Sequence, residues 1–324
     1  MNKFLLIIML SIACEGLAQT VSVTPHTSST SYHKTTRSGK TTYEESYSAS
    51  TSIRQDGYTG KESYGYGTSA DGTKKGRRTV MTASGYGTKT ADNISLTYPD
   101  IEIPVTSTKV KSQVITHVGY TISYNSHWLI PNWVAYCLTA EEVAGTFPRP
   151  KRAFEPDPQV KGKSAEHRDY SNSGYSRGHM APAADMKWSE QAMSESFYLT
   201  NICPQTPELN AGVWERLEKR CRALAGESDL YICCGPLMSK APERIGENGV
   251  AVPTGFYKVL CMRRNGKWQA IGFMFPNTAC KGSMFDFSCS VDDVEKTTGH
   301  DFFHTLPNDI EKSIESSYVI KDWR

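Results

Sequence analysis

One stretch of this 324-residue chain decides its fold and its chemistry. It reads YSRGHMAP at residues 175–182, NICPQ at residues 201–205 and NAGVWERLE at residues 210–218. An Arg-Gly-His triplet alone is common in proteins. The asparagine-rich segments that follow add the neutral and acidic oxygen ligands that a hard Mg²⁺ ion prefers, downstream of a histidine that can act as a base. The stretch therefore predicts a one-metal site for phosphodiester hydrolysis.

Side chains in and near this stretch match the three requirements of phosphodiester hydrolysis. His179 can take a proton from water, because imidazole titrates near neutral pH. Asn210 offers a single amide oxygen, which leaves Mg²⁺ most of its water and room for a phosphate oxygen. Arg177 and Arg152 carry guanidinium groups that match phosphate geometry and stay charged at every relevant pH.

The spacing of the last segment predicts a helix. Asn210, Trp214, Glu218 and Arg222 recur every fourth residue, and no proline interrupts residues 212–224. At ~1.5 Å of rise per residue, Asn210 and Glu218 would lie roughly 12 Å apart along the axis, too far to ligate one ion directly. Glu218 is therefore expected to act through a water of the metal. The alternative is a surface helix with a buried Trp214 and a solvated Glu/Arg face.

Six ordered blocks between about residue 98 and residue 324 resemble the DNA/RNA non-specific endonucleases, the ββα-metal nucleases. Besides the three segments quoted above, the blocks are NWVAY at 132–136, Arg152 with Phe154 and Asp157-Pro158, and TGHDFF at 298–303 with Leu306-Pro307. The resemblance implies His179 as general base, Asn210 as metal ligand, Glu218 as holder of the metal's water, Arg152, Arg177 and Arg222 as phosphate contacts, and Asn201 as a residue that orients the base or the substrate.

One departure from the family pattern concerns the residue three positions before the histidine. The family usually has Asp there, whereas this chain has Ser176. A carboxylate would lie near the histidine and the metal's waters, so its loss is expected to weaken metal binding or to shift the pKa of the base. The base, the metal ligand and the arginines are all present, which favours an active enzyme.

The resemblance implies an endonuclease that needs Mg²⁺, with Mn²⁺ as the alternative, and that cleaves DNA and RNA with little sequence preference. The formal net charge of +2 gives no general attraction to nucleic acid, so local groups such as the RPKR segment at 149–152 must supply it. One alternative is a surface protein with a decayed site that binds nucleic acid or cell-wall polymer through its N-terminal arm. Another is a phosphodiesterase for small nucleotides or another phosphodiester.

The chain is expected to have three parts. Residues 1–18 have the basic start, short apolar run and small-residue end of a signal peptide, so the protein is expected to be secreted, periplasmic or on the cell surface. Lipoprotein processing at Cys14 is the alternative. Residues 19–96 are rich in Ser, Thr, Gly and Tyr, which predicts a disordered arm. Residues 97–324 form the endonuclease-like domain, and no segment of the mature chain is apolar enough to cross a membrane.

Apolar patterns in the third part predict an α+β fold with a central antiparallel β-sheet flanked by helices around a ββα-metal core. Strands are expected at residues 114–124, 133–138, 230–234, 255–262 and 268–275, and helices at 140–143, 189–195, 212–225, 291–297 and 308–316. Asn265-Gly266 predicts a tight hairpin. Eight cysteines would remain after cleavage, and Cys280 and Cys289 flank an expected loop, which favours a disulfide between them.

Overall fold

The computed structural model of the chain describes residues 98–106, 110–150 and 154–324 in full, and residues 22–37, 40–55, 58–68 and 74–79 as strands only. The predicted signal peptide, Cys14 and Arg152 lie outside the described residues. The chain divides into two units, residues 1–95 and residues 96–324. No helix within the described ranges is both long and apolar enough to span a membrane.

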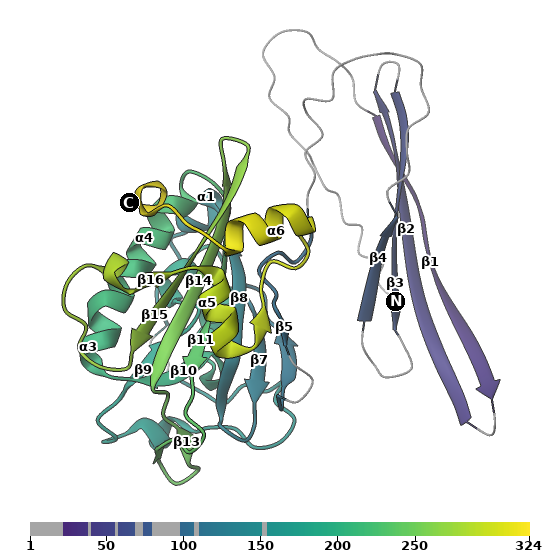
Figure 1. Ribbon diagram of the computed structural model, residues 1–324. Coiled ribbons are helices and arrows are strands. Elements are labelled where there is room, and N and C mark those ends of the chain that lie inside the picture. Colours follow the sequence, from purple (N-terminus) through teal and green to yellow (C-terminus); the bar gives the residue numbers. More distant parts are fainter. Residues whose placement is uncertain are drawn as a thin grey trace. The chain divides into compact units, whose positions relative to one another are not determined.

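The first unit contains a four-stranded antiparallel sheet in which the strands follow one another in chain order (Figure 1). Its strands are β1 (Ser22–Arg37), β2 (Lys40–Gln55), β3 (Tyr58–Thr68) and β4 (Lys74–Thr79). Burial of side chains would decide whether such a polar segment is stable by itself. Because the side chains of these strands are not described, the predicted disorder of residues 19–96 stays a prediction.

The second unit is built on a seven-stranded sheet whose order is β16-β15-β14-β11-β8-β7-β6, with every neighbouring pair antiparallel. Its strands are β6 (Gln113–Thr116), β7 (Thr121–Asn125), β8 (Ile130–Leu138), β11 (Leu230–Leu237), β14 (Gly255–Arg264), β15 (Lys267–Pro276) and β16 (Ser288–Cys289). The predicted α+β class with a central antiparallel sheet is confirmed.

Helices and short strands surround this sheet. The helices are α1 (Ala140–Val143), α2 (Glu190–Glu195), α3 (Pro207–Leu209), α4 (Glu215–Ala225), α5 (Val291–Thr298) and α6 (Asn308–Glu315), with 3₁₀ turns at His167–Tyr170, Ala183–Asp185, Leu199–Asn201, Met284–Phe287 and Ile320–Trp323. Three two-stranded ladders pair β9 (Ser176–His179) with β10 (Ile202–Gln205), β12 (Arg244–Ile245) with β13 (Val250–Ala251), and β5 (Val105–Thr106) with β17 (His300–Asp301).

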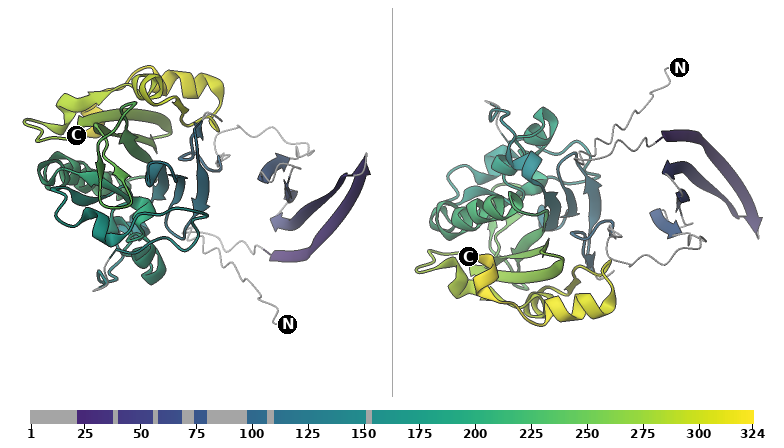
Figure 2. Two further views of the ribbon diagram at one scale, coloured as in Figure 1. Left: turned by 90° about the horizontal axis from the view of Figure 1, so that it is seen from below. Right: turned by 90° about the horizontal axis from the view of Figure 1, so that it is seen from above.

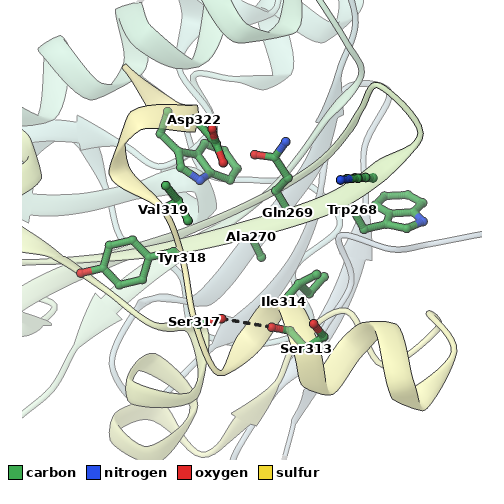
Figure 3. A pocket seen from close by; sticks show the side chains of 11 residues that line it. Trp268, Gln269, Ala270, Ser313, Ile314, Ser317, Tyr318, Val319 and Asp322 are labelled. Atoms are coloured by element: carbon green, nitrogen blue, oxygen red, sulfur yellow. Dashed lines mark hydrogen bonds between the residues drawn. The ribbon is translucent and has the colours of Figure 1, made fainter.

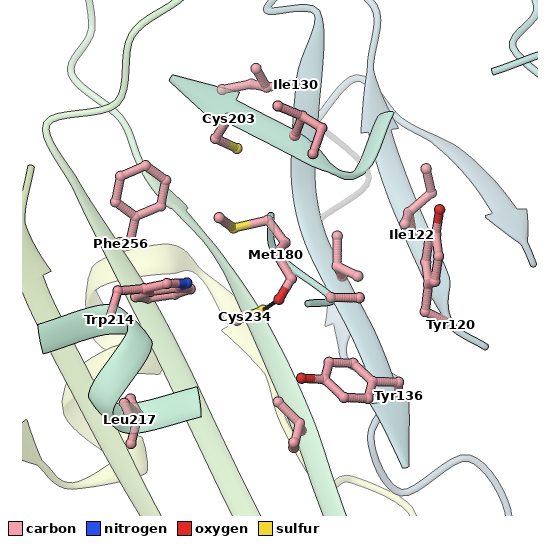
Figure 4. Close-up of a cluster of buried hydrophobic side chains, with 14 of the residues drawn as sticks. Tyr120, Ile122, Ile130, Tyr136, Met180, Cys203, Trp214, Leu217, Cys234 and Phe256 are labelled. Atoms are coloured by element: carbon pink, nitrogen blue, oxygen red, sulfur yellow. Dashed lines mark hydrogen bonds between the residues drawn. The ribbon is translucent and has the colours of Figure 1, made fainter. Parts of the chain in front are cut away.

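The sheet is buried on both faces, which explains why its central strands are mainly apolar. In β14, Phe256 and Leu260 pack with α4, while Val259 and Cys261 pack with α5 and α6 in a second core. Figure 2 shows α5 and α6 in yellow on one side of the sheet and the teal helices, α4 among them, on the other. Figure 4 shows part of the larger core, where Trp214, Met180 and Phe256 approach one another.

The single strand expected at residues 114–124 is wrong, because the structure turns there. β6 ends at Thr116, the chain reverses with a hydrogen bond from the His117 amide to the Tyr120 carbonyl (2.8 Å), and β7 returns beside it. Gly119 lies within the turn, and a Cβ atom there would come within 2.4 Å of Met186 Sδ. The apolar pattern continues through the turn because both strands bury side chains, so periodicity alone could not separate them.

The disulfide expected between Cys280 and Cys289 is also wrong, since both thiols are free. Cys289 lies in β16 opposite Gly272, and its Sγ atom would be 3.1 Å from a Cβ placed on that glycine. The Cys280 thiol is directed instead to the Pro276 and Thr278 carbonyls. Cysteines at the two ends of a loop can be bridged only when their side chains point toward each other.

Candidate active site

The three quoted segments form two antiparallel strands followed by a helix. In the β9–β10 ladder, His179 lies opposite Ile202 and Arg177 lies opposite Pro204. Alternation along β9 places Arg177 and His179 on one face, while Gly178 faces the other way, against Gln205. The chain leaves β10 and enters α3, a π-helical turn at Asn210–Trp214, and then α4. This is a ββα arrangement with the histidine at the end of its first strand.

The predicted stripe of side chains from residue 210 to residue 222 is interrupted. Thr206 caps α3 and Pro207 begins it, but Gly212 has non-helical dihedral angles (φ −105°, ψ −115°). The separation of Asn210 and Glu218 expected for a continuous helix therefore does not apply. Such π-helical turns occur frequently at functional sites. In the described part of the chain, the Asn210 side chain has no hydrogen-bond partner, so its amide oxygen is free to hold a ligand.

The imidazole of His179 lies between two aromatic rings. Its ring centroid is 5.3 Å from that of Phe154 and 5.2 Å from that of Phe197, which it meets edge-on. Burial, with a smaller contribution from the positive charge of Arg149, lowers the pKa of His179 to about 3. Nε2 is buried and has no hydrogen-bond partner among the described residues. The histidine is therefore neutral at neutral pH, with one ring nitrogen unengaged.

Two arginines stand beside this histidine. The guanidinium of Arg149 lies 4.9 Å from the centroid of the Phe197 ring, and the side chain is exposed. Arg177 Nη2 donates to the His167 carbonyl oxygen (2.8 Å), and its guanidinium lies 5.7 Å from the Tyr170 ring centroid. Arg152 is not among the described residues, so its expected phosphate contact stays a prediction. The site thus has a positive rim suited to an anionic ligand.

Asn201 is completely buried, and its side chain is occupied within the protein. Its Oδ1 accepts from the Ala181 amide (2.8 Å), and its Nδ2 donates to the carbonyls of Ala181 and Ser196 (both 2.9 Å). Both amide protons are therefore used, and the bonds hold the segment that follows His179. Of the two roles expected for Asn201, this geometry favours orienting the base over orienting the substrate.

Glu218 belongs to a buried group of charges between α4 and the sheet. Burial raises the pKa of Glu218 to about 8, and although Lys258 opposes this shift, Asp185 adds to it. Lys258 is fully buried on β14, with its Nζ atom 4.6 Å from the centroid of the Trp214 ring. Burial disfavours its charge, but the surrounding thiols and carboxylates raise the pKa of Lys258 above its ordinary value. The Lys258 ammonium group and the Glu218 carboxylate thus stabilise each other's charged form.

Arg222 has a partner inside the protein. Its Nη1 atom lies 2.6 Å from Asp185 Oδ1, with side-chain exposures of 20% for the arginine and 0% for the aspartate, and Tyr136 donates to the other carboxylate oxygen (2.9 Å). Burial raises the pKa of Asp185 above its ordinary value, although Arg222 and Tyr136 oppose this shift. The two short contacts favour the ionised pair. The expected contact of Arg222 with the phosphate stays a prediction, and the structure adds a structural role.

The donors in this site suit a hard divalent cation. Asn210 supplies a neutral amide oxygen that no described residue bonds, and Glu218 supplies a carboxylate whose raised pKa indicates that it needs positive charge nearby. Ser176, at the place of the usual Asp, lies opposite Gln205 at the start of β9 and contributes no charge. The histidine, the amide and the carboxylate all belong to the ββα segment, although no hydrogen bond joins them within the described ranges.

Several groups around the site escaped the sequence analysis. Arg149 appeared there only as part of a basic segment, and nothing in the sequence placed Phe197 against His179. Lys258 could have been noticed, because a lysine inside the apolar run of residues 255–262 has to be buried if that run is a central strand. Nothing in the sequence indicated a role for Asp185, because its partner Arg222 lies 37 residues away.

Two pockets among the described residues differ in their relation to this site. One, of about 630 Å³, is lined by Phe147, Arg149, Met193 and their neighbours, so it shares Arg149 with the surroundings of His179. The other, of about 250 Å³, lies between β15 and the C-terminal segment and is lined by Trp268, Gln269 and Tyr318 among others (Figure 3). It contains none of the predicted site residues.

Residues 98–309 match the family described as DNA/RNA non-specific endonuclease, and the chain belongs to this family. It is 40% identical over 207 residues to the mitochondrial nuclease EXOG of Danio rerio, covering 59% of this chain and 60% of that protein. It is 32% identical over 203 residues to the mitochondrial endonuclease G of Homo sapiens, covering 58% and 68%. The chain thus spans about three fifths of the EXOG relative's length.

A solved structure supports the same assignment. The crystal structure of the EndoG/EndoGI complex contains a chain that matches with a TM-score of 0.58 and 32% identity, over 61% of this chain and 89% of that one. Together with the central antiparallel sheet, this likeness confirms the predicted ββα-metal nuclease fold and the predicted family.

Proposed function

We propose that this protein is a metal-dependent endonuclease that hydrolyses DNA and RNA with little sequence preference. The observation that carries the proposal is the pair of unengaged polar groups in the ββα segment. They are the buried Nε2 atom of His179 at the end of β9 and the side-chain amide of Asn210 at the start of the helical segment, neither of which has a hydrogen-bond partner among the described residues. Buried polar atoms are normally paired, so an unpaired one at such a place suggests a ligand. Family membership supports the same activity.

In the proposed reaction, a water molecule attacks the phosphorus atom and the bond to the leaving oxygen breaks. Neutral His179 accepts the proton of the attacking water on Nε2, and its aromatic surroundings keep it neutral until then. Arg177 and Arg149 lie where they could balance the charge that builds on the phosphate oxygens. Arg152 and Arg222 remain predicted contributors to the same task.

Asn210 and Glu218 would hold the cation, which we propose to be Mg²⁺, with Mn²⁺ as an ion that the same oxygen donors accept. When bound, the cation supplies charge neutralisation at the phosphate oxygens and the leaving group. Because burial raises the pKa of Glu218 to about 8, that carboxyl must lose a proton when the cation binds near neutral pH.

Lack of sequence preference follows from the kind of groups in the site. The arginines and the proposed metal ligands address phosphate, which carries no base identity. DNA and RNA share this phosphodiester, so both are proposed as substrates.

We also propose that the protein is exported and loses residues 1–18, although the EXOG and endonuclease G relatives are named mitochondrial. Sequencing the N-terminus of secreted protein should then give Gln19 as the first residue.

The test is digestion of closed circular plasmid DNA and of RNA by purified protein, with Mg²⁺ or with EDTA. Closed circles have no ends, so their loss reports endonuclease action. We expect cleavage of both substrates with Mg²⁺ and none with EDTA. His179→Ala should lower the rate by ~10²–10⁴-fold, the usual contribution of a general base.

The matched control is His304→Ala, which removes an exposed histidine outside the ββα segment. This variant should cleave at the unaltered rate. Intact plasmid and RNA at every Mg²⁺ and Mn²⁺ concentration, from protein shown to be folded, would overturn the proposal and favour a binding protein with a decayed site. Loss of activity in both histidine variants would point to general damage and would remove the support for His179 as base.

A further inference from the structure

A cluster of carboxylates lies on the face of the sheet opposite α4. Asp292 and Glu295 are on α5, Glu315 is the last residue of α6, and one carboxylate oxygen from each lies within 4.8 Å of the others. Three oxygens at such separations could reach a single ion between them after small side-chain movements. Hard cations such as Ca²⁺ take carboxylates of this kind as ligands.

Glu315 separates this cluster from an ordinary acidic surface. It is only 6% exposed, and its Oε1 atom is buried without a hydrogen-bond partner in the part of the chain that the structure describes. A buried carboxylate oxygen is normally paired, because leaving it unpaired costs free energy. Here the unpaired oxygen belongs to a side chain that points at two other carboxylates. Its position at the C-terminal end of α6, the negative end of the helix dipole, is a further unfavourable feature for an anion.

The largest electrostatic contributions around Glu315 come from other carboxylates. Burial and the nearby carboxylates of Glu295, Glu311, Asp301 and Asp292 together raise the pKa of Glu315 to about 9, with burial as the largest cause. Glu295 Oε1 already accepts the Phe302 amide (2.8 Å), which fixes its side chain. The basic residues of these helices, Lys296 and Lys312, form no ion pair with the cluster in the part of the chain that is described.

We propose that Asp292, Glu295 and Glu315 bind a hard divalent cation, with Ca²⁺ as the ion that best tolerates such a flexible set of carboxylates. The site joins α5 to the end of α6. Its cation would supply the partner that the buried Glu315 oxygen lacks and would neutralise the excess negative charge. It shares no residue with the ββα segment and does not depend on the proposed nuclease function.

The test measures Ca²⁺ binding to the full chain by isothermal titration calorimetry, in an Asn210→Ala background that weakens the proposed active-site ion. We expect binding that Glu315→Gln weakens by about tenfold or more, because one of three charged ligands is lost. Binding near pH 7 should also release protons, since Glu315 must ionise, so the measured enthalpy should depend on the buffer.

The control is Asp309→Asn, which removes an exposed carboxylate from the same helix but outside the cluster, and it should leave the affinity for Ca²⁺ unchanged. Asp292→Asn changes an exposed ligand and repeats the test without risk to the core. The proposal is overturned if the Asn210→Ala protein binds no Ca²⁺ up to about 10 mM, above the weakest range of natural carboxylate sites. It is equally overturned if Glu315→Gln and Asp309→Asn have the same affinity.

Discussion

His179 is neutral because of where it lies. The rings of Phe154 and Phe197 pack against it, Arg149 disfavours a second positive charge, and burial with this charge lowers its pKa to about 3. A neutral imidazole is the form that can accept a proton, so His179 can act as a base over the whole physiological pH range. A bound phosphate would bring negative charge close to the ring and raise its pKa, which strengthens the base when the substrate is present.

Arg222 gives a prediction about stability. In Arg222→Ala, Asp185 loses its charged partner while remaining fully buried, which should lower the free energy of unfolding by about 3–5 kcal/mol. Urea unfolding followed by tryptophan fluorescence measures this change. If the arginine served only the substrate, the variant would unfold at the wild-type urea concentration and show only a raised KM.

A matched control exists on the same helix. Arg216 is exposed and donates only a 3.3 Å hydrogen bond to the Gly282 carbonyl, so Arg216→Ala should change the free energy of unfolding by no more than about 0.5 kcal/mol. Equal losses in the two variants would mean that the ion pair with Asp185 contributes nothing specific.

At the scale of elements, the β9–β10 ladder depends on a glycine. A Cβ atom at Gly178 would lie 2.0 Å from Gln205 Oε1, and Gln205 is completely buried and cannot move away freely. Gly178→Ala should therefore destabilise the fold by about 1–3 kcal/mol, the usual cost of overpacking, and should displace His179 at the end of the strand. Thermal unfolding and the plasmid assay together measure both effects.

A second substitution tests whether this contact is the cause. Gln205→Ala removes the atoms that would clash, so the double variant should recover stability relative to Gly178→Ala, and the two changes should not be additive. If the double variant is less stable than either single variant by the sum of their losses, the close approach of Gly178 to Gln205 is not what requires glycine.

Sequence patterns predicted well the elements that have a clear hydrophobic periodicity or a recognisable turn. The Asn265-Gly266 turn joins β14 to β15 as this dipeptide predicted, because Asn-Gly is a local signal for a tight hairpin. Patterns failed at the turn between β6 and β7 and at the π-helical turn after Asn210. There the course of the chain depends on distant partners such as Asp157, which bonds His117 (3.0 Å).

The same distinction holds for the candidate site. Residue types in order along the chain pointed to His179, Asn210 and Glu218, because the chemistry needs those groups. Their surroundings could not be anticipated, since burial and charge come from segments far away. The pKa of His179 and the pKa of Glu218 move in opposite directions for this reason: burial disfavours the charged form of each, which is the protonated form of one and the ionised form of the other.

For the whole molecule, buried carboxyl groups predict how stability depends on pH. Burial raises the pKa of Glu315 to about 9, so between about pH 4.5 and pH 9 the folded chain holds a proton that the unfolded chain releases. The free energy of unfolding must then fall as pH rises through this window, by at most ~1.4 kcal/mol per pH unit for this group.

Thermal unfolding in EDTA at pH 7 and pH 8.5 measures this dependence. The wild-type protein should lose more stability across the interval than Glu315→Gln, whose side chain cannot titrate, whereas the buried thiols affect both proteins alike. Added Ca²⁺ should reduce the difference between the two pH values in the wild type alone. Parallel losses in EDTA would show that Glu315 is not protonated in the fold.

The seven-stranded sheet, buried on both faces, has a consequence for how the molecule can change over evolutionary time. The proposed chemistry lies on the α4 side, while α5 and α6 cover the other side with a separate apolar core. Substitutions in α5 and α6 can therefore alter resistance to proteases and the lifetime of the molecule without changing its catalytic rate. Selection for persistence in a harsh medium and selection for speed would act on opposite sides of one sheet.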